Sequence, residues 1–370
     1  MGAGAEKFNP SIRDKLSAAG TLLRATVKHP EGVIDMFKRG ETPMAASIDI
    51  AANCNLRCQH CYLYEKGHQE EGIDDPNEFL AKVREMRDQN PGIVHVTWVG
   101  GEPMWRKEVL RETVKIFPTN WVITNGTIPV DGEWQNTAFF ISIDGTETIH
   151  NQIRQPWKQA KRGLQALPLV EEVPEQRRPG FNIYRRAKDT ARTATAPVYV
   201  HSVINKLNAG VIPELVDEWY KEGNVRGFAF SLHTPMIDQA RESGMTENDE
   251  RLFLSDEERT KVVVMLLALK KQYGKFIAMS DGHIKNYLPE RQLEVFGDKC
   301  RIVNGVISVD AKFNRKFPCV MGNSEGVEGN EMDCSKCGCA VPALVDRIAR
   351  FDFESSRLAF NIIAASKAAK

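Results

Sequence analysis

Apolar and polar residues follow two different periods along most of the chain. Short apolar runs rich in β-branched and aromatic residues, typical of buried strands, alternate with stretches whose apolar residues recur every three or four positions, typical of helices. The predicted strands cover residues 44–52, 92–103, 120–126, 137–145, 197–205 and 225–233. The predicted helices include 77–89, 106–117, 212–223 and 255–274, and the last opens with a capping box formed by Ser255 and Glu258.

This repetition of strand and helix predicts an α/β fold with a mostly parallel sheet covered by helices. Six strands suit a partial (β/α)6 TIM-like barrel, whose ligands bind at the carboxyl ends of the strands. We expect the barrel over residues 44–235, with an insertion at about 151–196, where basic residues and prolines exceed what one crossover helix requires. A helical connection (236–297), a small cysteine-rich extension (298–345) and a C-terminal tail (346–370) complete the predicted division.

Residues 1–43 predict a helical preface to the barrel. Ile12, Leu16, Ala19, Leu23 and Val27 recur at helical spacing, so one face of this helix is apolar. Residues 1–40 also contain seven Lys/Arg against four acidic residues. Two interpretations follow: the apolar face packs on the helix's own domain, or the helix makes peripheral contact with a membrane surface.

Composition narrows the class of protein. Hydrophobic residues make up 42% and charged residues 26% of the 370 positions, enough for a substantial core. Lys+Arg and Asp+Glu both number 49, which argues against nucleic acid as a partner. The N-terminus has no apolar signal-peptide core, and no run approaches the roughly 18 apolar residues of a spanning helix. We therefore expect a cytoplasmic protein.

The eight cysteines form two groups, and in a reducing cytoplasm such grouping indicates metal before disulfides. Cys54, Cys58 and Cys61 follow the first strand at spacing C-x3-C-x2-C. Three thiolates would hold an iron–sulfur cubane and leave one iron open, whereas structural zinc takes four closed ligands. The alternatives are a disulfide with one cysteine left over, or zinc with a fourth ligand from His60, His68 or His95.

The stretch "CNLRCQHCY" resembles the signature of the radical SAM superfamily, with Tyr62 as the aromatic residue after the last cysteine. The resemblance implies that Cys54, Cys58 and Cys61 hold a 4Fe–4S cluster whose open iron binds S-adenosylmethionine (SAM). It also implies a reductant such as ferredoxin or flavodoxin, and a 5′-deoxyadenosyl radical that abstracts hydrogen from a substrate carbon. The cofactors supply that chemistry, and the protein positions them.

Further motifs at strand ends are similar to the SAM-binding positions of that superfamily. In "VGGEP" the glycines allow close backbone approach and the acid suits a cation. "ITNG", "SIDG" and the asparagine that closes "VHSVIN" resemble its later strand ends. The resemblance implies that SAM is bound by Tyr62, Gly100, Gly101, Glu102, Pro103, Asn125, Ser142, Asp144 and Asn205.

Two of these motifs have simpler interpretations. Asp144 precedes a glycine, so its role could be limited to forming a turn. His201 could be an ordinary core histidine. "HNQIR" is close to the H-D-x-x-R of the superfamily, but Asn151 stands where aspartate is usual. No residue is assigned to catalysis on the substrate itself.

The distal cysteines resemble the auxiliary-cluster extensions called SPASM or, when shortened, twitch domains. Cys300 and Cys319 flank a glycine-containing hairpin, and Cys334, Cys337 and Cys339 follow in "DCSKCGC". Five cysteines suit one auxiliary 4Fe–4S cluster held by Cys300, Cys319 and Cys337, with Cys334 or Cys339 as the fourth ligand. A zinc knuckle is the alternative. The auxiliary cluster could bind substrate, accept an electron, or stabilise the fold.

These observations predict a radical SAM enzyme. The preface is too short for a separate leader-binding domain, so a small-molecule or lipid-like substrate is favoured and a peptide is the alternative. The basic preface favours a lipid, since it could hold the enzyme on an anionic surface. A non-catalytic iron–sulfur electron carrier or zinc-binding protein is a second alternative, but it gives no role to the motifs at the strand ends.

Overall fold

The structure is a computed structural model that describes residues 9–38, 42–65, 71–156, 182–326 and 331–368. Its centre is a seven-stranded sheet in the order β8-β7-β5-β4-β3-β1-β9, and every neighbouring pair is parallel. The sheet does not close, which confirms the α/β fold with a partial barrel. Its strands are β1 (Ala45–Ala51), β3 (His95–Gly100), β4 (Thr119–Thr124), β5 (Thr137–Ser142), β7 (Val198–Ile204), β8 (Phe228–Leu232) and β9 (Val306–Val309).

Six of these strands fall where the sequence predicts them, and β9 is an addition. It comes from the predicted cysteine-rich extension and pairs with β1, from Ala45 opposite Val306 to Ile48 opposite Val309. Two small antiparallel sheets accompany the main one. They pair β2 (Leu56–Cys58) with β6 (Arg154–Pro156) and β10 (Lys316–Phe317) with β11 (Asn323–Ser324).

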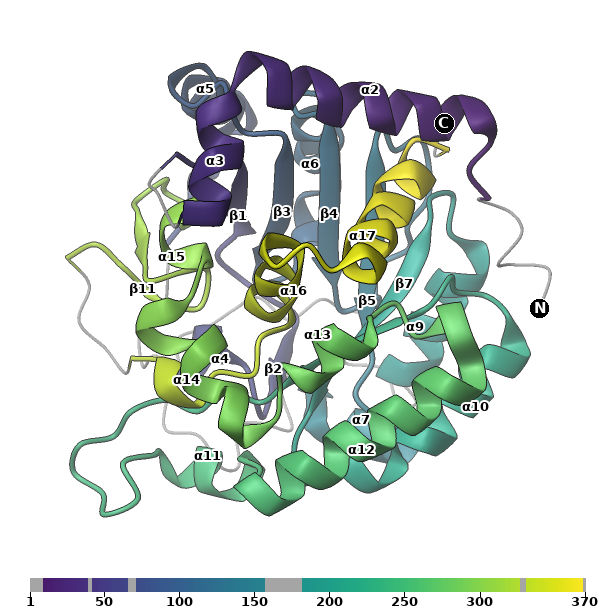
Figure 1. The fold of residues 1–370 in the computed structure, drawn as a ribbon, viewed down its shortest axis with the longest axis vertical. Helices are drawn as coiled ribbons and strands as arrows, with labels where there is room; N and C mark the ends of the chain where they lie inside the picture. The colour runs from purple at the N-terminus through teal and green to yellow at the C-terminus, as the bar shows by residue number, and fades with distance from the viewer. Residues whose placement is uncertain (1–8, 39–41, 66–70, 157–181, 327–330, 369–370) are drawn as a thin grey trace.

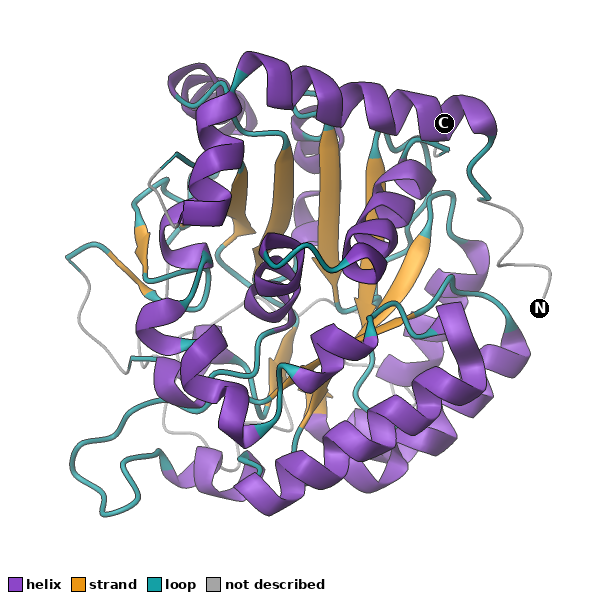
Figure 2. Ribbon diagram, viewed as in Figure 1, coloured by secondary structure: helices purple, strands orange, loops and turns teal. Residues whose placement is uncertain are grey.

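Helices surround the sheet, as the purple and orange ribbons of Figure 2 show. The predicted capping box of Ser255 and Glu258 is present at the start of the long helix α12. The helices are α2 (Ile12–Lys28), α3 (Pro30–Lys38), α4 (Tyr62–Glu65), α5 (Pro76–Gln89), α6 (Lys107–Thr113), α7 (Glu147–Ile153), α9 (Ile183–Thr193), α10 (Ile212–Glu222), α11 (Glu247–Leu252), α12 (Asp256–Tyr273), α13 (Asp281–Lys285), α14 (Gln292–Val295), α15 (Ile302–Gly305), α16 (Ala340–Ala349) and α17 (Phe353–Ser366).

The sheet buries residues on both faces. On one face, side chains such as Trp98 and Phe230 join the main core. On the other, Ala138, Phe140 and Tyr199 form a second apolar cluster with Ile362 of α17. The predicted C-terminal tail (346–370) contains α17 and the end of α16, which begins in the predicted extension, and both helices lie in front of the sheet in Figure 1.

The large apolar side chains of α2 point away from the rest of the protein. Ile12, Leu16, Leu23 and Val27 are 64–78% exposed, whereas the small residues Ala18 and Ala25 on the other side are buried. The helix does pack on its own domain, through these small residues and α17, but the expectation that its large apolar residues form the packing face is wrong. The helix is amphipathic as predicted, but its inward face is the one made of small side chains.

Helix α2 crosses one end of the sheet (Figure 1). Just before α2, Asn9 accepts a hydrogen bond of 3.4 Å from Arg226, which precedes β8. At its other end, His29 lies against Gly92, which precedes β3. These contacts are at the amino-terminal ends of the strands, hereafter the amino edge, opposite the carboxyl edge where the cysteine motif begins. No helix in the described ranges is long and apolar enough to cross a membrane.

Candidate active site

The three cysteines of the proximal motif lie in the segment that follows β1. Strand β2, which contains Cys58, pairs with β6 so that Cys58 faces Arg154 across the ladder. Burial raises the pKa of Cys54 well above its ordinary value, and the charges of Glu102, Cys58 and Cys61 raise it further. Burial raises the pKa of Cys58 more than the charge of Arg154 lowers it, and the resulting pKa is about 12. The thiols are close enough to oppose one another's ionisation, and bound iron would reverse that preference.

Arg154 connects the cysteine segment to the end of β5. Its Nη1 lies 3.7 Å from the Cys58 sulfur, and its Nε donates to Asp144 Oδ2 at 2.6 Å. His60 is also near, at 3.5 Å from Arg154 Nη2 and 3.4 Å from Asp144. The final residue of the "HNQIR" motif therefore points a fixed positive charge at the proximal thiols.

The first residue of that motif and its unusual asparagine also have defined contacts. Asp144 N–H donates to Nδ1 of His150, which holds the turn after β5. Asn151 accepts a hydrogen bond of 3.0 Å from the backbone N–H of Tyr184 at the start of α9. The asparagine thus connects α7 to α9. Residues 157–181 of the predicted insertion lie outside the described residues.

The zinc alternative for the proximal cysteines finds little support in the positions of the histidines. His95 begins β3 at the amino edge and contacts Thr97 and Thr119, so it cannot join ligands at the carboxyl edge. His68 lies outside the described residues. Among the residues that are described, no three His, Cys, Asp or Glu side chains converge closely enough to hold one metal ion.

The double glycine after β3 lets the backbone pass against the cysteine segment. A Cβ on Gly100, whose φ is +107°, would lie 2.4 Å from Ala51 O. A Cβ on Gly101 would lie 1.9 Å from Asn53 O and 2.8 Å from Cys54 N. Real Cβ atoms do not approach backbone so closely, so this contact requires glycine. The glycines therefore do allow the close backbone approach that the sequence predicts, and the group approached is the backbone of the cysteine segment.

Glu102 is a buried carboxylate, 1% exposed, beside that contact. Its Oε1 accepts hydrogen bonds from Thr124 Oγ1 at 2.6 Å and Met104 N at 3.0 Å, and its Oε2 accepts one from Asn125 N at 2.7 Å. Pro103 begins a short 3₁₀ helix directly after it. Burial raises the pKa of Glu102 despite these donors. A cation placed here would stabilise the carboxylate.

A network of amides lies over the first cysteine. Asn125 Nδ2 is 2.8 Å from Asn55 Oδ1 and 3.7 Å from the Cys54 sulfur. Thr127 links the two asparagines, because it donates to Asn125 Oδ1 at 2.7 Å and accepts from Asn55 Nδ2 at 2.8 Å. The sequence predicts a role for Asn125 but not for Asn55 or Thr127. Their buried positions give no sequence signal beyond the nearness of Asn55 to Cys54.

Asp144 is fully buried just past β5. Burial alone would raise its pKa, but Arg154, His60, His150 and the N–H of Val203 outweigh burial and lower the pKa to about 2. The residue is therefore ionised and fixed by partners from several segments, which goes beyond the turn-forming role left open by the sequence.

The remaining residues that are predicted to bind SAM make fewer contacts with distant segments of the chain. Ser142 ends β5 and is buried. Asn205 is fully buried, and its Oδ1 accepts from Leu207 N at 2.9 Å, so its amide supports its own turn. His201 on β7 contacts Ser231 on β8 at 2.9 Å. Tyr62 begins α4, with the Lys316 ammonium 5.6 Å from its ring centroid.

Lys316 forms a second buried ion pair that the sequence analysis missed. Its Nζ lies 2.6 Å from Asp49 Oδ2, and both side chains are fully buried. Asp49 belongs to β1 and Lys316 to β10, so the pair joins the sheet to the cysteine-rich extension. Positions 267 residues apart in the chain gave no sign of this contact.

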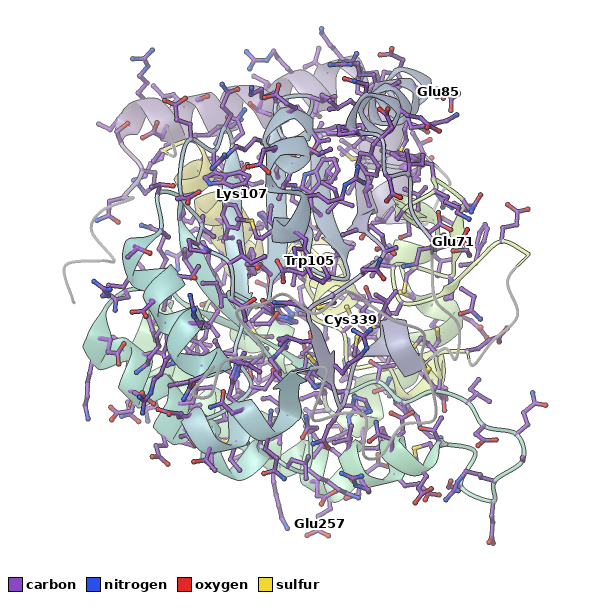
Figure 3. All side chains as sticks on the ribbon, turned by 180° about the vertical axis from the view of Figure 1, so that it is seen from behind. Glu71, Glu85, Trp105, Lys107, Glu257 and Cys339 are labelled. Atoms are coloured by element: carbon purple, nitrogen blue, oxygen red, sulfur yellow. The ribbon has the colours of Figure 1, made fainter. Side chains whose placement is uncertain are left out.

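The five distal cysteines gather in one region. Burial, together with the charges of Cys319 and Cys300, raises the pKa values of Cys334 and Cys339 to about 12. Burial and the charge of Cys339 raise the pKa of the buried thiol Cys337, and Cys319 and Cys300 raise it as well. All eight cysteines are free thiols. Cys339, labelled in Figure 3, lies near the middle of that view.

The C-x-C departure in the distal group has a structural reason. Leu232 N–H, at the end of β8, donates to Gly338 O at 2.8 Å, and Gly338 N–H donates to Thr234 Oγ1 at 2.9 Å. A Cβ on Gly338 would lie 2.4 Å from Leu232 O. Glycine between the two cysteines therefore allows this segment to pair with the end of β8 and brings the distal group to the carboxyl edge of the sheet.

Comparisons with known proteins agree with this arrangement. Residues 48–167 match the family model of the radical SAM superfamily. Streptococcus suis SuiB bound to S-adenosylmethionine has a similar fold, with 13% identity, a TM-score of 0.54 and 79% of this chain covered. The chain spans 63% of that SuiB chain. Native anSMEcpe with bound AdoMet and the Cp18Cys peptide is similar at 17% identity and TM-score 0.51, over 78% of this chain and 77% of that one. No curated protein sequence matches the chain.

Proposed function

We propose that this chain is a radical SAM enzyme, because residues 48–167 match that family model, and that Cys54, Cys58 and Cys61 hold the 4Fe–4S cluster to which SAM binds. The observation that carries the proposal is the grouping of these three thiols beside Glu102 and Asn125 at the carboxyl edge. When bound, the cofactors supply a 5′-deoxyadenosyl radical that abstracts hydrogen from a substrate carbon.

The residues around the thiols suit a negatively charged group. Arg154 and Asn125 each point an N–H at a sulfur, both at 3.7 Å. Such donors stabilise thiolates over thiols and orient them. The glycines Gly100 and Gly101 keep the neighbouring strand end against the cysteine segment, which fixes Cys54 relative to Glu102.

We assign SAM binding to the remaining predicted positions. The carboxylate of Glu102 suits the SAM ammonium, because a buried carboxylate gains from a nearby cation. Asp144, held ionised by Arg154, can accept hydrogen bonds from ribose hydroxyls. The other predicted SAM-binding residues would contact SAM by packing or by polar groups: Tyr62, Pro103, Ser142 and Asn205.

For the substrate we favour a small polar molecule. Polar pairs lie towards the carboxyl edge, including His201 with Ser231 and the buried His233, 2.6 Å from Asp249. The preface gives no support to a lipid-like substrate, because α2 lies at the amino edge, opposite the proposed site. A peptide is the second candidate, since the structures of SuiB with the precursor peptide SuiA and of anSMEcpe with a peptide have similar folds.

Helix α2 supports a separate proposal of peripheral membrane contact. Its exposed apolar row is accompanied by the exposed basic residues Arg13, Lys15, Arg24 and Lys28, a pattern that suits an anionic lipid surface. The expected result is flotation with liposomes containing anionic lipid, reduced by Leu16→Ser/Leu23→Ser. Val264→Ser, which removes an apolar side chain 62% exposed on α12, is the matched control. Equal flotation of both variants would contradict the proposal.

The predicted domain division remains a proposal, as does a cytoplasmic location with a ferredoxin or flavodoxin as reductant. We also propose one auxiliary 4Fe–4S cluster held by Cys300, Cys319 and Cys337, with Cys334 or Cys339 as the fourth ligand. The nearness of all five thiols supports this, and it does not decide between the last two.

The enzymatic proposal is tested by anaerobic reconstitution with iron and sulfide, followed by SAM and dithionite. We expect 5′-deoxyadenosine from the wild-type protein and none from Cys58→Ala. Gln59→Ala is the matched control, because Gln59 lies in the same segment without a thiol and its amide donates to Gln152 O. Absence of 5′-deoxyadenosine from the wild-type protein would leave the electron-carrier alternative.

A further inference from the structure

Arg259 is a buried cation beside the distal cysteines. It lies on α12, is 3% exposed, and points its guanidinium at the segment that contains Cys337. Its Nη2 donates to Cys337 O at 3.3 Å, and its Nη1 lies 3.5 Å from Lys336 O. Gln292 donates to the same Cys337 carbonyl at 2.9 Å. These contacts fix the guanidinium next to a buried thiol.

Among the described residues the Arg259 guanidinium forms no ion pair, although the charge of Asp256, three residues earlier in the chain, acts on it from a longer range. Within the described residues, no Asp or Glu lies at ion-pair distance from its guanidinium, and its Nε has no hydrogen-bond partner. Two other buried cations differ in this respect, because Arg154 pairs with Asp144 and Lys316 with Asp49, each at 2.6 Å. A buried charge without a counter-charge is costly, so such a group usually faces an anion.

The distal thiols are candidates for that anion, because Arg259 donates to the backbone of Cys337. A charge on Cys337 acts on Arg259 more strongly than the charge of Asp256 does, and Cys339, Cys319 and Cys300 act in turn on Cys337. Four thiolates around a 4Fe–4S core give a centre with net charge −2 when oxidised and −3 when reduced. A zinc ion with four thiolates would also be anionic, but it would not change charge with potential.

We propose that Arg259 is the counter-charge of an anionic iron–sulfur centre at the distal cysteines and that it sets the reduction potential of that centre. The inference rests on the proposed auxiliary cluster. Reduction adds one electron and one negative charge to the centre, and a fixed positive charge nearby favours the reduced form. Arg259 is therefore a positioning residue for redox chemistry, and its effect is separate from SAM cleavage at the proximal site.

The test uses a variant that isolates the distal site. Cys54→Ala/Cys58→Ala/Cys61→Ala removes the proximal ligands, so that iron content and a redox titration followed by EPR report the distal centre alone. We expect about four iron atoms per chain in this background. Arg259→Gln should change the ratio of oxidised to reduced centre tenfold at a given potential. This corresponds to a midpoint that is more negative by about 59 mV for one electron.

Arg259→Lys is the conservative variant and should restore most of the midpoint, because it keeps the charge. The matched control is Arg111→Gln. Arg111 lies on the outer helix α6 and pairs with Asp131, so its removal should leave the midpoint unchanged. An unchanged midpoint in Arg259→Gln with full iron content would overturn the inference and leave Arg259 a purely structural contact. Equal iron loss in the Gln and Lys variants would overturn it as well.

Failure of the inference is distinguishable from failure of the proposed function. If the distal site binds no iron, the counter-charge proposal fails. Formation of 5′-deoxyadenosine by the protein with intact Cys54, Cys58 and Cys61 still reports the proximal chemistry. If the distal centre forms and shows the expected shift while no 5′-deoxyadenosine is made, the proposal for Arg259 stands and the proposed function fails.

Discussion

Replacing Arg154 by glutamine removes the positive charge that faces Asp144 and the Cys58 sulfur. The arginine side chain is 8% exposed, and the Asp144 side chain is fully buried. Glutamine keeps much of the aliphatic volume but cannot neutralise the carboxylate. Asp144 would then be a buried charge left with the Val203 N–H at 2.9 Å and two nearby histidines, His60 and His150. Burial lowers the pKa of each histidine to about 3, so both are neutral near pH 7.

The size of the effect follows from the ionisation of Asp144. Its pKa is lowered from an ordinary value of 3.8 to about 2, which corresponds to about 2.4 kcal/mol at about 1.36 kcal/mol per pKa unit. Removal of one partner from a buried pair costs about 3–5 kcal/mol in general. We therefore expect Arg154→Gln to lower the free energy of unfolding by about 3 kcal/mol at neutral pH.

The dependence on pH follows from the same shift. A carboxylate whose pKa is lower in the folded state stabilises the protein above its unfolded pKa, and this contribution is lost as pH falls through the folded pKa. For Asp144 the window runs from about 3.8 down to about 2. In Arg154→Gln burial is no longer offset by the arginine, so the pKa of Asp144 rises and the loss of stability in this window should shrink or reverse.

The assay is urea unfolding of the metal-free protein under anaerobic conditions, near pH 7 and through the acidic window. A double-mutant cycle with Asp144→Asn isolates the pair, and a coupling of about 2–3 kcal/mol is expected. Arg185→Gln is the control: its guanidinium is 3.1 Å from Glu147 but 72% exposed, so its loss should cost less than about 1 kcal/mol. A cycle coupling near zero, or equal losses in Arg154→Gln and Arg185→Gln, would refute the reasoning.

Two further changes test the contacts around the site. Lys316→Met should destabilise the protein by about 3–5 kcal/mol because it removes the ammonium that lies 2.6 Å from the buried Asp49 carboxylate, whereas Lys312→Met at an exposed pair should have a much smaller effect in the same unfolding assay. Gly101→Ala should cost about 2 kcal/mol or more and reduce iron loading, because its Cβ would meet Asn53 O at 1.9 Å. Gly210→Ala, with nothing within 4 Å of its Cβ, should be nearly neutral, and equal effects at both glycines would contradict the steric argument.

The sheet and much of the proposed site could be predicted from the sequence because both depend on local pattern. Six apolar runs correspond to β1, β3, β4, β5, β7 and β8, and the candidate residues follow their carboxyl ends. Parallel strands bring such ends to one edge, so Glu102, Asn125 and Cys54 could be expected to meet before any contact was known.

Features that depend on distant contacts could not be predicted. Strand β9 is four residues long and gains its place only by pairing with β1. The direction of the apolar face of α2 was misjudged because its second face, with Ala18 and Ala25, consists of small residues that periodicity alone does not mark as buried. The unpaired charge of Arg259 likewise depends on burial by several segments, which no local pattern records.

The cysteine-rich extension contacts both outer strands of the six predicted from the sequence. Strand β9 pairs with β1 on one side, and the backbone of Gly338 accepts a hydrogen bond from Leu232 of β8 on the other. The proximal cysteines follow β1, and Cys337 and Cys339 flank Gly338, so the sheet itself determines the separation between the two groups of thiols. Electron exchange between two centres depends on their separation. On the proposal that both groups of thiols hold iron–sulfur centres, the pairing of β9 with β1 and the contact of Gly338 with Leu232 place both centres on the same sheet.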